Sequence, residues 1–310
     1  MAGKKSGVAI VGGGIMGGDI ATIFAAGGWN VHVMSPSAKT REALPARLSV
    51  GLNKLGADAV NGALVKTWAS LNTMPWAAID LVVEAATEDL ALKQKLFTQL
   101  EALARPDVPL ASNTSTFPIG AIGKHLKTRS RVLGLHYFMP AHLVPLVEVI
   151  QADFTDARVA DWLEQTQKDL GKAPVRVNKD IPGFIGNRLQ HAMMREALYL
   201  IADGVTSPEG VDIAVRYGFG FRFLACGPMM QKEMSGWDTN FYAGSSLYPS
   251  LHREQAPPQF LKDMVDQGRI GMKTGRGLWE WTDESIAAEK TRIEKALQAA
   301  FAILKAESGK

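Results

Sequence analysis

A glycine-rich stretch near the start of the chain constrains the fold more than any other feature. Gly12-Gly-Gly14-Ile15-Met16-Gly17 fits the pattern G-x-G-x-x-G. It follows a short apolar run at 7–11 and opens a helix-like stretch at 15–26. A strand, a glycine turn and a helix in this order form the phosphate-binding unit of dinucleotide-binding domains. The sequence therefore predicts a nucleotide cofactor at this turn, and an ordinary glycine turn is the weaker alternative.

The residues of this motif have separate physical roles. Gly12 permits the tight turn, and Gly14 lets the backbone approach a pyrophosphate. Gly17 allows the helix to pack closely on the strand. The free N–H groups at the helix start, around Ile15 and Met16, offer donors to the anion. We predict that these five residues bind the cofactor.

The second part of the dinucleotide fingerprint is an acidic residue about 20 positions further on, which binds the adenosine ribose. At that place the chain has Met34-Ser35-Pro36-Ser37, with Lys39 and Arg41 behind it and no carboxylate. Hydroxyls and cations without an acid are compatible with a 2′-phosphate, and hence with NADP. The alternative is an NAD enzyme that lacks this hydrogen bond and leaves both cations solvated on a helix. Ser35 leaves NAD and NADP open.

The patterning divides the chain into two parts. Up to residue 180, short apolar runs alternate with helix-like stretches, which predicts βαβ units on a mostly parallel sheet. The predicted strands after the first are 30–34, 81–83, 109–111, 132–137, 146–150 and 175–177. After Asp180 only helix-like segments follow, at 184–203, 208–217, 229–241, 259–267 and 283–306. We predict an α/β Rossmann dinucleotide-binding domain over 1–180 and an all-α C-terminal domain over 181–310.

Composition and charge exclude several classes of protein. The chain has 34 basic and 31 acidic residues, a net charge of +3 and no basic stripe, which argues against a nucleic-acid partner. Cys226 is the only cysteine, so an internal disulfide or a thiolate-based metal site is excluded. No apolar stretch approaches the 18 residues of a membrane span, and the patterned sequence begins after Ser6. We expect a cytoplasmic protein without a membrane partner.

A histidine and a glutamate stand in two neighbouring strand-like runs. His136 lies in the run 132–137, and Glu148 lies in the run 146–150. If the two runs form a hairpin centred near His142, residues 136 and 148 are opposite each other. A carboxylate there would fix the imidazole tautomer and raise its basicity, as proton removal from a hydroxyl requires. The alternative is a core histidine that is satisfied by a buried glutamate.

Taken together, the motifs resemble the L-3-hydroxyacyl-CoA dehydrogenase family over nearly the whole chain. Together and in this order, the motifs that carry the resemblance are highly specific. They are the residues 9–17, Val83-Glu-Ala-Ala-Thr-Glu88, Ser112-Asn-Thr-Ser115, the His136 and Glu148 runs, Ile181-Pro-Gly-Phe-Ile-Gly-Asn-Arg188 and Lys273-Thr-Gly-Arg-Gly277. The resemblance implies an oxidoreductase that transfers a hydride between NAD(P) and the 3-hydroxy or 3-keto carbon of a 3-hydroxyacyl-CoA. It also implies a small-molecule acyl substrate and a role in fatty acid metabolism. We expect a homodimer through the helical domain, which has too few elements to bury its own apolar faces.

The resemblance also implies roles for individual side chains. His136 would be the general base in oxidation and, as imidazolium, the acid in reduction, with Glu148 orienting it. Ser115 would bind the substrate oxygen, and Asn187 would help to place the substrate. The nicotinamide side of the cofactor would be lined by Glu88, Lys93 and Asn113. Structural alternatives are a polar loop cap for Ser115 and Asn113, a helix-start amide for Asn187 and a solvated helix face for Lys93.

Three departures from the family pattern bear on the substrate. Met139 replaces an asparagine three positions after the histidine, and Ser35 replaces the usual acid. The helical hairpin after the second strand, which helps to hold CoA in the family, is only moderately basic here, with Lys39, Arg41, Arg47 and Lys54. The tail 283–310 resembles the branch that acts on free hydroxy acids, such as the gulonate and carnitine dehydrogenases. A CoA thioester and a free acid therefore both remain open.

Arg222 is a candidate anchor for the carboxylate of a free-acid substrate. It lies in Phe219-Gly-Phe-Arg-Phe223, and a cation among aromatic residues is costly to bury without a partner. The alternative is a surface arginine stacked on Phe221 or Phe223.

Two rival functions are less well supported. The 6-phosphogluconate-type β-hydroxyacid dehydrogenases resemble residues 10–26, but their catalytic lysine follows a glycine spacing that Gly171-Lys172 lacks. A dinucleotide-binding protein without turnover is favoured by Met139 and Ser35. The set His136, Glu148, Ser115 and Asn187 argues against it.

Overall fold

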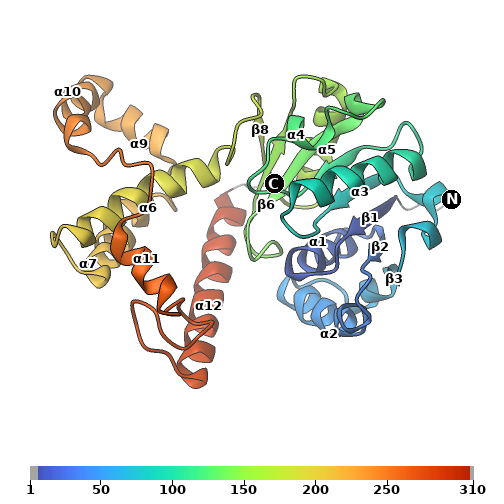
Figure 1. Cartoon of the computed structure of the whole chain (residues 1–310), viewed down its shortest axis with the longest axis horizontal. Coiled ribbons are helices and arrows are strands. Elements are labelled where there is room, and N and C mark those ends of the chain that lie inside the picture. Colours follow the sequence, from blue (N-terminus) through green and yellow to red (C-terminus); the bar gives the residue numbers. More distant parts are fainter. Residues whose placement is uncertain (1–5, 308–310) are drawn as a thin grey trace. The chain divides into compact units, whose positions relative to one another are not determined.

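The computed structural model describes residues 6–307, and the chain divides into two compact units, Met1–Asn187 and Arg188–Lys310 (Figure 1). Residues 181–187, which we predicted as the start of the helical domain, pack with the first unit.

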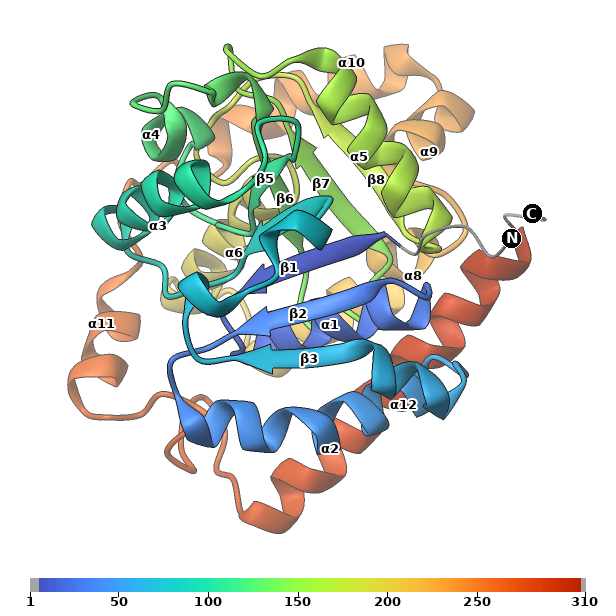
Figure 2. The same ribbon diagram turned by 90° about the vertical axis from the view of Figure 1, so that its right-hand side faces the viewer.

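The first unit is built around one sheet, whose eight strands within residues 6–307 have the order β3-β2-β1-β4-β5-β6-β7-β8 (Figure 2). All neighbouring pairs are parallel except β6 and β7. The strands are β1 Gly7–Val11, β2 Asn30–Met34, β3 Val65–Trp68, β4 Leu81–Glu84, β5 Leu110–Ser112, β6 Val132–Tyr137, β7 Leu146–Ile150 and β8 Ala173–Val177. The strand β3 was not predicted from the sequence, because this edge strand is short and only partly buried.

Helices cover both faces of this sheet. In β1, Val8 and Ile10 belong to an apolar cluster that includes residues of α1, α2 and α5, whereas Ala9 and Val11 belong to a cluster with α3 and α4. This division follows from the alternation of side chains along a strand. The helices are α1 Ile15–Ala26, α2 Ala38–Lys54, α3 Leu90–Leu103, α4 Ile119–Gly123 and α5 Ala157–Asp169. With both faces covered, ligands bind at the carboxyl ends of the strands.

The strand order reverses at β1, because β2 lies on one side of it and β4 on the other. The glycine turn leaves β1 at this point. Gly12 N donates to the carbonyl of Met34, the last residue of β2, and Ala85 N, just after β4, donates to the carbonyl of Val11. The predicted cofactor turn therefore lies at the crevice where dinucleotides bind in this topology.

The second unit consists of helices, as predicted. They are α6 Gly186–Ala202, which begins in the first unit, then α7 Pro208–Ile213, α8 Gly220–Arg222, α9 Pro228–Ser235, α10 Trp237–Leu247, α11 Gln259–Asp266 and α12 Asp283–Glu307. The predicted single helix at 229–241 is two helices, because Gly236 has a φ of 87° and ends α9. Among the helices of residues 6–307, none has the length and apolar character that crossing a membrane requires.

Candidate active site

The centre of the site is a histidine–carboxylate pair on two antiparallel strands. His136 on β6 is opposite Glu148 on β7, as the hairpin prediction required. Nδ1 of His136 lies 2.7 Å from Oε2 of Glu148, and both residues are almost fully buried. An ionised carboxylate can only accept, so Nδ1 carries the proton. Nε2 of His136 is left to act on a ligand, since it bonds to no residue within 6–307.

The second oxygen of Glu148 is held by the start of α6. Oε1 accepts hydrogen bonds from the N–H groups of Ile185 and Gly186, each at 2.8 Å. These donors converge because Phe184, a buried residue, has a φ of 50° in the left-handed region. Such a conformation is costly for a bulky side chain, and residues strained in this way cluster at active sites and ligand clamps. Its ring also packs 5.7 Å from the imidazole of His136.

These contacts keep Glu148 ionised. Burial raises the pKa of Glu148, but the hydrogen bonds from His136, Gly186 and Ile185 lower it by more, so the net pKa lies below the ordinary carboxyl value. A carboxylate that stays charged can orient the imidazole and stabilise the imidazolium.

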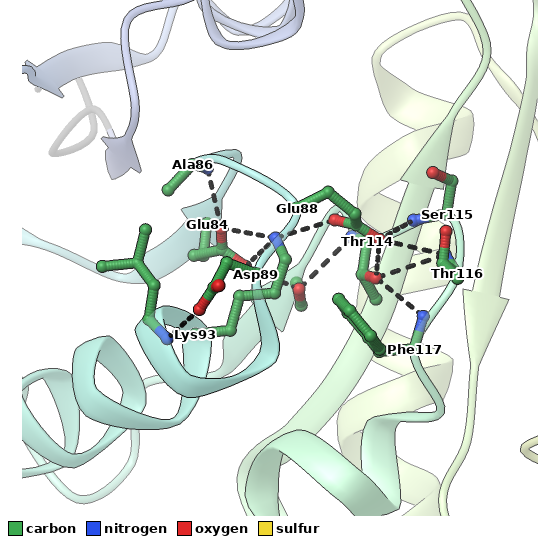
Figure 3. A network of polar contacts seen from close by, with 11 residues as sticks. Glu84, Ala86, Glu88, Asp89, Lys93, Thr114, Ser115, Thr116 and Phe117 are labelled. Atoms are coloured by element: carbon green, nitrogen blue, oxygen red, sulfur yellow. Dashed lines mark hydrogen bonds and ion pairs between the residues drawn. The ribbon is translucent and has the colours of Figure 1, made fainter.

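A second buried network surrounds Lys93 on α3 (Figure 3). Its Nζ lies 2.8 Å from Oε1 of Glu84 and 3.2 Å from Oε2 of Glu88. Ser112 Oγ donates to the other oxygen of Glu84 at 2.6 Å. Lys93 is only 1% exposed, so the alternative of a solvated helix face is wrong. Glu84 was not predicted as a site residue, although a lone carboxylate in the apolar run of β4 requires a buried partner.

Glu88 connects this network to the loop after β5. Its Oε1 accepts from Thr114 Oγ1 at 2.5 Å and from the N–H groups of Ser115 and Thr116 at 3.2 and 3.1 Å. Burial raises the pKa of Glu88, but the bond from Thr114 and the charge of Lys93 outweigh it and lower the net value. Glu88 therefore fixes the backbone of Ser115, whose hydroxyl donates to no group within residues 6–307.

Two asparagine amides join the same loop to the histidine and to α6. Oδ1 of Asn113 accepts from the N–H of Tyr137, the residue after His136, at 2.9 Å. Nδ2 of Asn187 donates to the carbonyl of Ser115 at 3.2 Å. The structure thus connects the predicted catalytic residues in one site. Their predicted actions on substrate and cofactor remain predictions.

The glycine turn fits a dinucleotide. Gly12 has a φ of 116°, and a Cβ there would lie 2.4 Å from the carbonyl oxygen of Ala85. A Cβ on Gly17 would lie 1.7 Å from the carbonyl oxygen of Gly12, so both positions require glycine. At Gly14, the N-cap of α1, a Cβ would meet nothing within 4 Å, which leaves room for a phosphate beside Ile15 and Met16.

The loop between β6 and β7 is held by two charged residues whose contacts with it were not predicted from the sequence. Asp19 on α1 accepts from the N–H of Ala141 at 3.0 Å and lies 3.2 Å from Nδ1 of His142. Lys172 donates to the carbonyls of Ala141 and Val144 at 2.6 and 3.0 Å. Burial lowers the pKa of Lys172 to about 8, and the charge of Asp19 opposes this.

Two further residues from the sequence analysis stand apart from this network. Met139 is 68% exposed in the β6–β7 loop. Arg222 belongs to the second unit, in a groove of about 600 Å³ that Cys226 and Lys232 also line. When the side-chain amide of Gln231 is oriented with its oxygen toward the guanidinium of Arg222, this oxygen lies 2.8 Å from Nη1 and 2.9 Å from Nε of the arginine. The partner of Arg222 is therefore this amide, and no stacking on Phe221 or Phe223 is found within residues 6–307.

Comparisons with known proteins agree along most of the chain. Residues 7–181 match the family model of the 3-hydroxyacyl-CoA dehydrogenase NAD binding domain, and residues 183–281 match the model of the C-terminal domain. A relative from Escherichia coli K12, 3-hydroxyadipyl-CoA dehydrogenase, is 36% identical over 89% of this chain, and the match spans 59% of that protein.

A second type of relative matches over its full length. The 5-formyl-3-hydroxy-2-methylpyridine 4-carboxylate 5-dehydrogenase of Mesorhizobium japonicum is 31% identical over 96% of this chain and 97% of that protein. A crystal structure of an enzyme with this activity, described as an NAD+ dependent dismutase, has a TM-score of 0.91 at 29% identity. It covers 97% of this chain and 99% of that one.

Proposed function

Because this chain belongs to the 3-hydroxyacyl-CoA dehydrogenase family, whose members are NAD-dependent dehydrogenases of 3-hydroxyacyl-CoA and related hydroxy acids, we propose that it interconverts a 3-hydroxy and a 3-keto acyl compound. The observation that carries the proposal is the arrangement of His136 and Glu148. Nε2 of His136 is free to act on a ligand, while its Nδ1 is held by the ionised carboxylate of Glu148. A dinucleotide site alone would not need this pair.

The residues of the first unit divide the chemistry among them. When bound, the nicotinamide accepts or supplies the hydride. Nε2 of His136 takes the proton of the substrate hydroxyl in oxidation and returns it in reduction. Glu148 stays ionised and stabilises the imidazolium, and the free hydroxyl of Ser115 donates to the substrate oxygen.

A CoA thioester is the first candidate substrate class. It is the class named by the family models and by the Escherichia coli relative. A role in fatty acid metabolism would follow from it.

A free hydroxy acid is the second candidate, and one structural observation favours it. We predicted a helical hairpin after β2, but the chain has the single helix α2, followed by a 3-10 turn at Ala59–Leu64 and by β3. One of its four cations, Arg47, already donates through both Nη groups to backbone carbonyls of this chain. The match with the Mesorhizobium japonicum relative, whose name gives a pyridine carboxylate, covers 97% of that protein.

The first test is the initial rate of acetoacetyl-CoA reduction against that of free acetoacetate, each with NADH and with NADPH. A rate with the thioester alone assigns the first class, and a rate with the free acid alone assigns the second. Binding of a cofactor without turnover of either compound or of further free 3-keto acids would favour a dinucleotide-binding protein that has lost activity.

We also infer that the helical unit is covered by a second copy of the chain. Six of its large apolar side chains within residues 6–307 are at least 70% exposed, namely those of Tyr217, Phe221, Met234, Phe241, Tyr242 and Tyr248. Apolar exposure of this extent in one helical unit marks an interaction surface. Solution scattering should give the mass of a dimer, and a monomeric mass would contradict this inference.

A further inference from the structure

The turn that follows β2 carries cationic side chains and no acidic one. It comprises Ser35, Pro36 and Ser37 and the first turn of α2, through Arg41. Nη1 of Arg41 donates to the carbonyls of Ser35 and Pro36, at 2.6 and 3.0 Å. Its Nε and Nη2 groups donate to no residue within 6–307. Arg41 is therefore held in place by the backbone, with the other edge of its guanidinium available to a ligand.

This turn lies against the glycine loop. Gly12 N donates to the carbonyl of Met34, the last residue of β2. A Cβ on Gly13 would lie 3.2 Å from Cβ of Ser35 and 3.0 Å from Cγ2 of Thr40. In a dinucleotide-binding domain the ribose next to the adenine meets the chain at this junction.

A second guanidinium adds positive charge at the same junction. Nη1 of Arg47 donates to the carbonyl of Gly13, and Nη2 donates to those of Gly14 and Ile15. These acceptors are neutral, and no carboxylate of residues 6–307 forms an ion pair with Arg41 or Arg47. Because no carboxylate in the described part of the chain neutralises either charge, the junction attracts an anion.

We propose that the Ser35–Arg41 turn binds the 2′-phosphate of NADP(H), so that this chain prefers the phosphorylated cofactor. The proposal rests on the proposed function as a dinucleotide enzyme. A carboxylate at position 35 would bind the ribose hydroxyls of NAD and repel a phosphate, whereas Ser35 offers a hydroxyl. The two free donors of Arg41 match two phosphate oxygens, and the first N–H groups of α2 add further donors.

The test measures binding of adenosine fragments by titration calorimetry, without turnover. We expect 2′,5′-ADP to bind about tenfold or more tightly than 5′-ADP, which corresponds to at least about 1.4 kcal/mol. Arg41→Ala should abolish this difference and leave the 5′-ADP affinity within about twofold. Ser35→Asp should reverse the preference. The matched control is Arg158→Ala, which removes an equal charge at an exposed arginine of α5. Arg158 pairs with Asp156, the N-cap of that helix.

The possible failures are distinguishable. Equal binding of both fragments by the wild-type protein would overturn the phosphate site and leave the dinucleotide function intact. Binding of neither fragment would overturn the dinucleotide function itself. If Arg41→Ala unfolds, which circular dichroism would show, Ser35→Asp decides, because an unchanged preference in that variant contradicts the proposal.

Discussion

Asp19 and Lys172 bind the two polar groups of one residue, Ala141. Asp19 accepts from its N–H, and Lys172 donates to its carbonyl. Ala141 lies in the loop that joins the strand of His136 to the strand of Glu148. Since Asp19 is on α1, the helix that follows the glycine turn, the pair links the cofactor helix to the loop between the two catalytic strands.

Lys172→Met should destabilise the protein by about 1–3 kcal/mol, because the carbonyls of Ala141 and Val144 lose their donor. Urea unfolding measures the loss. The folded-state pKa of Lys172, about 8, lies below the ordinary value of 10.5, so the folded protein releases this proton first. The unfolding free energy of the wild-type protein should therefore rise between these two pH values relative to Lys172→Met. Parallel pH dependences of the two proteins would contradict the burial of a charged lysine.

His136→Gln should lower kcat by about 10²–10⁴-fold, because the proton acceptor is removed. The affinity for the cofactor should stay within a few-fold, since the glycine turn is untouched. Stopped-flow rates and equilibrium binding measure the two effects. If kcat and the cofactor affinity fall by the same factor, His136 is a structural core residue and not the proton acceptor.

Glu148→Gln should reduce kcat by about 10–100-fold, because a neutral amide stabilises the imidazolium less than a carboxylate does. Its remaining oxygen can still accept from Ile185 and Gly186, so α6 should keep its start. The folded-state pKa of Glu148 is lowered, so its stabilising effect is present above the ordinary value of 4.5 and is lost as the pH falls. Acid titrations of unfolding should show a weaker loss of stability in Glu148→Gln than in the wild-type protein.

Lys93→Met should be strongly destabilising, by about 3–5 kcal/mol, because the fully buried Glu84 would be left as an unpaired charge and Glu88 would lose the same cation. The double variant Lys93→Met with Glu84→Gln removes one of these charges and should recover part of the loss. Thermal or urea unfolding of both variants decides. If the double variant recovers no stability, the loss in Lys93→Met comes from packing around the side chain and not from its charge.

If a substrate carboxylate displaces the Gln231 amide from Arg222, Arg222→Ala should raise KM for a free-acid substrate by about tenfold or more, because a charge-assisted bond is lost. The control is Arg292→Ala, an arginine of the same unit that pairs with Glu289. An increase no larger than that of the control would remove Arg222 from the substrate site.

The sequence alone determined the features whose signal is local or periodic. The glycine turn is encoded in six consecutive residues, and its place between strand and helix was confirmed. The opposition of His136 and Glu148 follows from a short hairpin, because side chains repeat every two residues along a strand and the loop fixes the register. The division of the chain into an α/β part and a helical part also followed from the sequence, because short strand-like runs give way to the helical period.

Only the tertiary structure decided the contacts between distant segments. Glu84 receives its cation from the next helix and a hydroxyl from the neighbouring strand. Asp19 and Lys172 meet the same loop from positions more than 150 residues apart in the sequence. The free edge of Arg41 depends on which carbonyls the turn presents to it. Sequence patterns report which side chains are buried, whereas the partner of a buried charge is fixed only when the elements pack, and at that step the charge must be paired.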